Sequence, residues 1–247
     1  MTAGTFLRHR HATGRIIAVA CAMLMTGLVA PESAHAAGAY AVDDSDISDP
    51  GTCGADSWAS FSTHRDVVAT TNLICGIPFV IPLEMSTEIS RSNGSGSWAT
   101  TVAPQVKINI IPSGVGAIGV GIAGGFTYNL TDIGTASTAV YIPVTLTPND
   151  KVRINLNLGW LHDRVAHLDW LTWGVGAEFS VTDTVTLIGE VSGQSGHSVR
   201  PRSTAWPHVQ AGIRVTPRES FDIDVIYGRN ITGENRNWIT LGLNVRF

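Results

Sequence analysis

Apolar and polar side chains alternate along most of the chain and up to its last residue. In the closing stretch NWITLGLNVRF, residues 237–247, Leu241 and Leu243 share one parity, and Thr240 and Asn244 share the other. Because successive side chains of a β-strand point to opposite faces, this alternation predicts strands with one apolar and one polar face. Similar segments recur at a spacing of about ten to fifteen residues, which is typical of an all-β barrel or sandwich.

The positions of the aromatic residues distinguish these two classes. In a soluble sandwich, aromatic side chains are spread through the core between the two sheets. Here they stand near the ends of the predicted strands, with mostly Val, Ile, Leu and Ala between them: Trp98, Phe126, Tyr128, Trp160, Phe179, Phe221, Tyr227 and Phe247. An aliphatic belt between two aromatic rings is the arrangement of an outer-membrane barrel. We therefore expect an all-β fold, a transmembrane antiparallel up-and-down β-barrel.

The lengths of the connections indicate how many strands there are. Counted back from the C-terminus, longer and shorter connections alternate, as in bacterial barrels with long outer loops and short periplasmic turns. Residues 91–97 are among the expected long connections, and residues 112–115 among the short ones. With first strands near residues 57–63 and 69–75, the count is about twelve. These two segments alternate poorly, so about ten strands after an N-terminal periplasmic segment is the alternative.

The chain begins with the features of a secretory signal peptide. Residues 8–15 carry arginines and no acid, residues 16–30 are apolar, and Ala34-His35-Ala36 forms a small-x-small cleavage site. The apolar run is about fifteen residues, shorter than the roughly twenty that a spanning helix needs, so a membrane anchor is the weaker alternative. We therefore expect residues 1–36 to be removed after Sec-type export, and the mature protein to reside in the bacterial outer membrane.

The predicted mature chain divides into a short tail and the barrel. Residues 37–55 are rich in Asp and low in hydrophobicity, a composition that favours disorder, so we predict a periplasmic tail followed by the barrel over residues 56–247. The alternative is that this acidic stretch is a plug inserted into the barrel. Space for a plug or a narrow pore is left by small residues on one predicted inner wall: Ala117, Gly119, Gly121, Ala123 and Gly125.

Two cysteines remain after the predicted cleavage, Cys53 and Cys75. In a barrel of about twelve strands, both fall near the periplasmic ends of neighbouring strands. An even pair in an oxidising compartment is compatible with one disulfide, and two free thiols is the alternative.

If the polar parity faces inward, the inner wall carries charges of both signs. The predicted lumen-lining residues, candidates for a pore wall, are Glu84, Glu88, Lys107, Lys151, Arg153, Glu178, Glu190, Arg214, Asp222, Asp224 and Arg246. Their near balance fits either mutual pairing or a weakly selective aqueous pore. The short turn at Pro217 predicts a cross-strand ion pair between Arg214 and Asp222, for which a structural role is favoured over a role in transport.

Three stretches of the C-terminal half carry a resemblance to a known family: WGVGAEFSVTDTVTLIGEV, QAGIRVTPRESFDIDVIYGRNITG and ITLGLNVRF. They resemble outer-membrane transporter-like barrels described as channel proteins of the phenol meta-cleavage degradation pathway. The resemblance implies a barrel fold and the passage of small molecules, hydrophobic or aromatic ones among them. The terminal Phe247 is similar to the last residue of other outer-membrane proteins, which implies recognition by the barrel-assembly machinery.

The sequence therefore predicts an outer-membrane channel for passive passage of small solutes, with the membrane lipid, the assembly machinery and the solute as partners. The alternative is a closed structural or adhesion barrel with functional extracellular loops and no pore. A formal net charge of −4 does not suggest a nucleic-acid partner. Loop residues with potential chemistry have no diagnostic spacing, so we predict no enzyme, catalytic residue, metal or cofactor; these residues are His162, Asp163, His167, Asp169, His197 and Ser198.

Overall fold

The computed structural model describes residues 39–63, 65–94, 97–196, 207–231 and 236–247. The predicted signal peptide, residues 1–36, lies outside the described residues. Among those that are described, no helix is long and apolar enough to cross a membrane.

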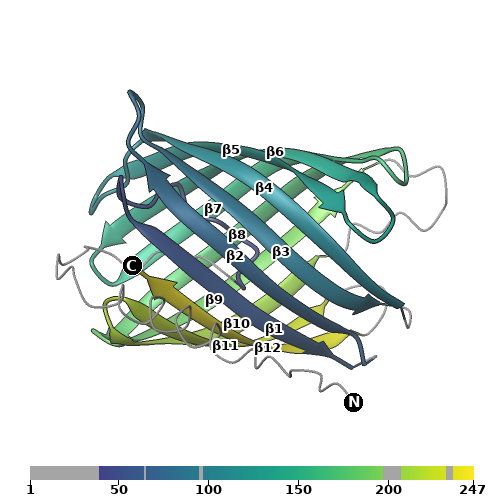
Figure 1. The fold of residues 1–247 in the computed structure, drawn as a ribbon. Helices are drawn as coiled ribbons and strands as arrows, with labels where there is room; N and C mark the ends of the chain where they lie inside the picture. The colour runs from purple at the N-terminus through teal and green to yellow at the C-terminus, as the bar shows by residue number, and fades with distance from the viewer. Residues whose placement is uncertain (1–38, 64, 95–96, 197–206, 232–235) are drawn as a thin grey trace, which may run out of the picture. The chain divides into compact units, whose positions relative to one another are not determined.

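The described chain forms a closed barrel of antiparallel strands (Figure 1). The strands are β1 (Cys53–Ser62), β2 (Val67–Ile77), β3 (Leu83–Gly94), β4 (Ser97–Ile111), β5 (Ile118–Asn129), β6 (Gly134–Asn149), β7 (Val152–Asp163), β8 (Leu168–Thr182), β9 (Val185–Ser195), β10 (His208–Arg218), β11 (Phe221–Asn230) and β12 (Asn237–Arg246). Each strand pairs with its neighbours in sequence, and β12 pairs with β1. The predicted up-and-down barrel of twelve strands is confirmed, and the alternative of ten is wrong.

The pairing of β1 with β12 closes the barrel. It runs without a register shift from Gly54 opposite Arg246 to Ser62 opposite Trp238. The last residue takes part: the amide of Cys53 donates to the carbonyl of Phe247 at 2.9 Å, and the amide of Phe247 donates back to the carbonyl of Cys53 at 2.8 Å. A closed ladder leaves no strand edge, so the backbone polar groups of the first and last strands are satisfied within the barrel.

Burial alternates along the strands as the sequence pattern predicts, with the apolar parity outside. In β11, Asp222 and Asp224 are fully buried, whereas Val225 is 51% exposed and Tyr227 is 52% exposed. Strands β8 and β12 show the same alternation. Buried acids and exposed aliphatic residues are the reverse of a soluble domain, because the outer surface faces lipid and the polar groups face inward.

The lengths of the connections differ from the prediction near β4. Only residues 95 and 96 separate β3 from β4, where a long loop was expected, while the predicted short turn between β4 and β5 spans residues 112–117. The expected loop is absorbed by pairing, because Arg91 lies opposite Thr100 and Asn93 opposite Trp98. The polar residues that were predicted to form a loop therefore extend the β3–β4 hairpin.

The outward position of Val225, near the middle of β11, gives a quantitative test. Val225→Arg should lower the free energy of unfolding in lipid vesicles by about 2–4 kcal/mol, because a cation near the bilayer midplane is poorly solvated. Denaturant titration of the barrel folded into vesicles measures the change. Val225→Leu is the matched control and should be close to neutral; an arginine as well tolerated as leucine would contradict the lipid-facing assignment.

Candidate functional site: a segment inside the lumen

Residues 39–49, here called the lumenal segment, lie inside the barrel. Hydrogen bonds or ion pairs join them to inward side chains of β3, β4, β6, β7, β9 and β10. Glycines bring β5 and β8 against the segment at Ser45 and Val42. A segment that contacts strands around most of a closed barrel lies in its lumen. The structure differs here from the predicted periplasmic tail of residues 37–55, and the barrel begins at Cys53 rather than at residue 56.

The entry of the segment is fixed at the rim next to β2. The amide of Gly51 donates to the carbonyl of Gly76 at 2.8 Å, and the amide of Gly76 donates to the carbonyl of Thr52 at 2.9 Å. A Cβ at position 76 would collide with the backbone of Asp49, so only glycine allows this close approach. A disulfide of 2.08 Å joins Cys53 to Cys75, the two cysteines that the sequence left for pairing. The lumenal segment is therefore tethered at one end.

Near this rim, serine hydroxyls hold the segment to β3 and to the β4–β5 connection. Both the amide and the hydroxyl of Ser48 donate to one carboxylate oxygen of Glu84 on β3, each at 2.8 Å. The hydroxyl of Ser113, in the β4–β5 connection, donates to Asp46 at 2.8 Å.

The acids of the segment contact two cations of the wall. The ammonium of Lys107 on β4 lies 3.1 Å from Asp43 and 3.7 Å from Asp44, and the hydroxyl of Tyr141 on β6 donates to Asp43 at 2.7 Å. The guanidinium of Arg153 on β7 lies 3.4 Å from Asp44 and also contacts Asp46. These pairs explain why an acidic, weakly hydrophobic stretch is ordered: the carboxylates of Asp43, Asp44 and Asp46 each have a partner from the barrel.

Small side chains on β5 leave the room that the segment occupies. Ser45 is fully buried, its amide donates to the hydroxyl of Thr145 at 2.9 Å, and its carbonyl accepts from Asn109 at 2.7 Å. A Cβ at Gly119 would collide with the hydroxyl of Ser45. Of the glycines predicted to line one wall, Gly119 and Gly121 thus lie against Ser45 of the inserted segment, whereas Gly125 lies against Pro104 and Gln105 of β4.

The far part of the segment meets β8, β9 and β10. The amides of Ala41 and Val42 donate to one oxygen of Glu190 at 2.8 and 3.2 Å. Val42 is 2% exposed and packs over Gly174, where a Cβ would lie 2.7 Å from a valine methyl group. The ring of Tyr40 lies 5.4 Å from the guanidinium carbon of Arg214, a cation–π contact.

A second buried polar cluster occupies the wall formed by β10, β11 and β12. Arg214 donates to both oxygens of Asp224, at 2.8 and 3.0 Å, and Asn244 donates to Asp224 at 2.9 Å. Asp222 contacts Arg246 and accepts from Thr216 at 2.6 Å. The predicted pair of Arg214 with Asp222 is wrong: the turn lies nearer to Phe221 than expected and β10 carries a bulge after Val215, so Arg214 stands opposite Asp224.

Most predicted lumen-lining residues lie on the inner wall. Fully or largely buried there are Glu84, Lys107, Arg153, Glu178, Glu190, Arg214, Asp222 and Asp224, and Glu88 and Arg246 are partly buried on the same parity. Lys151 is the exception, because it lies exposed in the turn between β6 and β7.

Sequence reasoning missed several acids that belong to the same interior. Asp56 is buried on β1, in a segment whose alternation was too weak to assign a face, and Asp43, Asp44 and Asp46 were placed in a tail. Without Lys151 and with Asp56, acids outnumber bases on the described inner wall, even before the lumenal segment is counted. The predicted near balance of charge does not hold for the part of the barrel that the structure describes.

The loop residues considered for catalysis do not form a site in the described chain. His162 and Asp169 pair at 2.9 Å near the β7–β8 hairpin, where His162 also stacks on Trp160. His197 and Ser198 lie outside the described residues. No group of three or more His, Cys, Asp or Glu side chains in the described ranges has the arrangement of a metal site.

Closed strand order, an apolar exterior and a polar lumen define the class of protein: an outer-membrane-type β-barrel. A family model described as "Uncharacterised conserved protein UCP029691" matches residues 24–247, so the chain belongs to that family. This is not the phenol meta-pathway family that the sequence resembles, so membership in that family stays a prediction. The search of curated proteins found no match.

Solved structures with the same fold are outer-membrane barrels. One is the COG4313 outer membrane channel from Pseudomonas putida F1, with a TM-score of 0.63 and 10% identity over 83% of this chain and 98% of the other. The KdgM porin in complex with disordered oligogalacturonate has a TM-score of 0.59 and 10% identity over 78% and 99%. The NanC porin has a TM-score of 0.60 and 10% identity over 77% and 98%. At this identity the likeness extends to the fold, and these neighbours are named as channels or porins rather than enzymes.

The bidentate pair of Arg214 and Asp224 predicts a large effect on stability. Arg214→Met should lower the free energy of unfolding by about 3–5 kcal/mol, because it leaves a buried carboxylate without its cation. The double variant Arg214→Met, Asp224→Leu should recover part of this loss, since both charges are then removed. Denaturant titration in vesicles gives both values; a double variant as unstable as the sum of the two single variants would contradict a direct buried pair.

Proposed function

We propose that the protein is an outer-membrane channel for small polar solutes, in which the lumenal segment occupies the path and shifts to open it. The observation that carries this proposal is the way in which the segment is held. Hydrogen bonds and ion pairs to a polar wall attach most of it, and only Val42 packs as a deeply buried apolar side chain. Water and a polar solute can replace such contacts at small net cost, whereas an apolar plug would have to expose its hydrophobic surface.

The geometry of the tether supports a movable segment. Its base is bound covalently next to the rim through the Cys53–Cys75 disulfide, so displacement of residues 39–48 leaves the strands and their closure intact. Gly51 has a φ of 89°, a left-handed conformation that glycine adopts without strain, at the point where the chain turns from β1 into the lumen. The segment can therefore change position without unfolding the barrel.

The chemistry of the wall favours hydrophilic solutes. Buried inward side chains are mostly acids, amides, hydroxyls and cations, including Thr145, Asn155, Gln210, Thr240 and Asn244. A hydrophobic or aromatic solute, as the family resemblance implied, would find few apolar contacts on this wall. Since acids outnumber bases on it, an opened lumen should favour cations over anions. The KdgM structure contains an oligogalacturonate, which is a property of that porin.

The second candidate is a closed barrel with a structural or adhesive role. The specific observation in its favour is the filling of the interior: the lumenal segment contacts nine strands, β2 to β10, and the Arg214 cluster occupies the wall of β10 to β12. In this case the segment is a permanent part of the core.

Conductance of the protein in planar bilayers separates the two candidates. The full chain, purified from membranes, should give small or intermittent steps, and deletion of residues 40–48 should give larger, steady steps because the lumen is emptied. Gly119→Val should act in the same direction without a deletion, since its side chain collides with Ser45. The matched control is Gly189→Val on β9, where nothing lies within 4 Å of the added Cβ.

Conductance is compared only among variants that keep the heat-modifiable gel migration of a folded barrel. Steps that grow on deletion, with a reversal potential shifted toward cations in a salt gradient, support the channel. A deletion variant that folds and yet shows no steps above background contradicts it and favours the closed barrel. A preference for anions would contradict only the proposed role of the acidic wall in selectivity, and the channel proposal itself would stand.

We also propose Sec-type export, removal of residues 1–36 and residence in the outer membrane, with Phe247 as the signal for the barrel-assembly machinery. The exposed apolar exterior supports a membrane location, and 74% of Phe247 is exposed at the end of β12. Deleting Phe247 should lower the amount of folded barrel in outer membranes, because recognition is lost, while the conductance of each inserted molecule stays unchanged. The amount is measured by gel migration of membrane fractions. Wild-type amounts of the truncated barrel would contradict the assembly role.

A further inference from the structure

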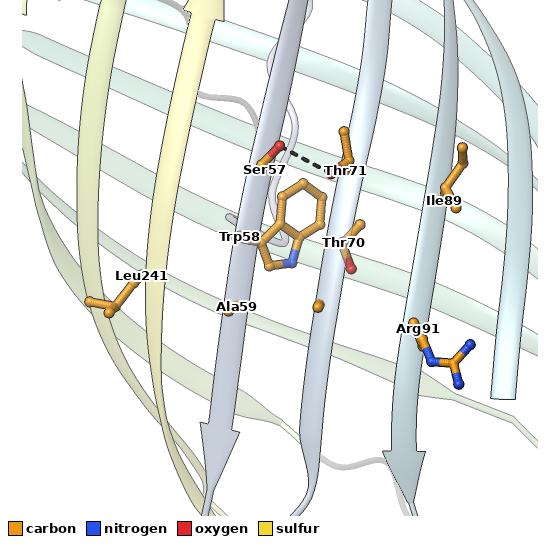
Figure 2. A pocket seen from close by; sticks show the side chains of 9 residues that line it. Ser57, Trp58, Ala59, Thr70, Thr71, Ile89, Arg91 and Leu241 are labelled. Carbon is orange, nitrogen blue, oxygen red and sulfur yellow. Dashed lines mark hydrogen bonds between the residues drawn. The ribbon is translucent and has the colours of Figure 1, made fainter. Parts of the chain in front are cut away.

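The outer, lipid-facing surface of the barrel has a depression across β12, β1, β2 and β3. Its volume is about 610 Å³, and Figure 2 shows the side chains that line it. Ser57, Ala59, Ala69 and Thr71 form its floor on the outward parity, and the hydroxyls of Ser57 and Thr71 share a hydrogen bond of 3.1 Å. The indole of Trp58 belongs to the inward parity of β1 and lies behind this floor.

The strand register explains the shape of the depression. Leu241, Ala59, Ala69 and Arg91 stand in one cross-strand row from β12 to β3. The two central positions of this row are alanines, whereas the flanking strands β12 and β3 carry the larger Leu241 and Arg91. The larger Leu241 on one flank and Ile89 on the other, both about half exposed, form the walls. The result is an apolar groove that follows the strands, about as wide as two strands.

Arg91 is an unusual side chain for this surface. It points outward, in the same row as the membrane-facing Leu241, yet it carries a fixed charge. Its guanidinium carbon lies 5.2 Å from the ring centroid of Trp98, one row nearer to the β3–β4 hairpin, and the group donates to the hydroxyl of Thr100 at 3.4 Å. These contacts direct the charge from the apolar belt toward the interface.

Within the described chain no carboxylate forms an ion pair with Arg91. An arginine on the lipid face of a barrel is costly unless an anion or the interface solvates it, so the lipid is the source from which a partner anion can come. Arginine binds phosphate in a bidentate manner, and the apolar groove beside it matches an acyl chain. The phosphate of such a lipid is thus matched by Arg91, and its acyl chain is matched by the adjacent apolar groove.

We propose that this depression binds one acylated, phosphorylated glycolipid of the outer leaflet. Its acyl chain lies along Ala59 and Ala69 between Leu241 and Ile89, and its phosphate contacts Arg91. The choice of leaflet rests on the proposed outer-membrane location, with Cys53 and Phe247 on the periplasmic side and the β3–β4 hairpin on the outer side. The glycolipid binds as a fixed neighbour of the barrel wall and is separate from any solute in the lumen.

Native mass spectrometry of the full chain, delipidated in detergent and mixed with diphosphorylated lipid A, tests the proposal. The wild-type barrel should retain one lipid A molecule. Arg91→Gln should reduce retention several-fold by removing the phosphate partner, and Ala69→Leu should do so by filling the floor of the groove. The matched controls are Arg229→Gln, an exposed arginine on β11, and Ala177→Leu, an exposed alanine on β8; both should retain lipid A as the wild type does.

Two further probes make the result decisive. The wild type should bind dephosphorylated lipid A several-fold more weakly than diphosphorylated lipid A. Wild type and Arg91→Gln should bind dephosphorylated lipid A equally, since Arg91 contacts only the phosphate. Equal retention of lipid A by all variants overturns the proposal. A preference for phosphatidylglycerol over lipid A, or a second copy of this chain in place of the lipid, also overturns it. Because lipid retention is measured without conduction, failure here is distinguishable from failure of the channel proposal.

Discussion

The structure depends on the closure of β12 onto β1. Inside a bilayer each backbone amide and carbonyl needs a partner from the protein, and an open sheet would leave two edges unsatisfied. The pairing from Gly54–Arg246 to Ser62–Trp238, extended by the reciprocal bonds of Cys53 and Phe247, removes both edges. Once the sheet is closed, the two parities of each strand face different media. The apolar parity meets lipid, and the polar parity is enclosed with whatever fills the lumen.

Enclosure creates a second constraint, because buried charges are tolerated only when they are paired. The barrel meets it in two ways. On β10 to β12, cations and acids of the wall pair with each other, as Arg214 does with Asp224. On β4 and β7, Lys107 and Arg153 pair with acids that arrive on the lumenal segment, besides approaching Glu84 and Glu178 of the wall. The segment is therefore part of the charge compensation of the interior, and any movement of it must leave Lys107 and Arg153 with other partners or with water.

The features that follow from local pattern could be predicted most accurately from the sequence. The alternation of Ile223, Asp224 and Val225 is enough to assign their faces, since the period of a strand is fixed by its geometry. Register was less accessible: Arg214 was assigned to Asp222 because the position of the turn and the bulge after Val215 shift the pairing. Residues 91–97 look like a loop by composition and are paired in a hairpin, because backbone pairing tolerates polar side chains at the barrel rim. Asp56 gave no usable signal, because the alternation of β1 is interrupted by small and polar outward residues such as Ser57.

By itself, the sequence determined the strands, their two faces, the apolar exterior and the pair of cysteines available for a disulfide, because each of these follows from residue type and a period of two. Only the tertiary structure decided what occupies the lumen. The acidic stretch before β1 has the composition of a disordered tail, and its order comes from partners far away in sequence, such as Thr145 for Ser45 and Glu190 for Val42. Those groups meet only after twelve strands have closed around them. Its composition predicts disorder for the isolated segment in water, whereas its conformation here is set by contacts with a wall that exists only in the folded barrel.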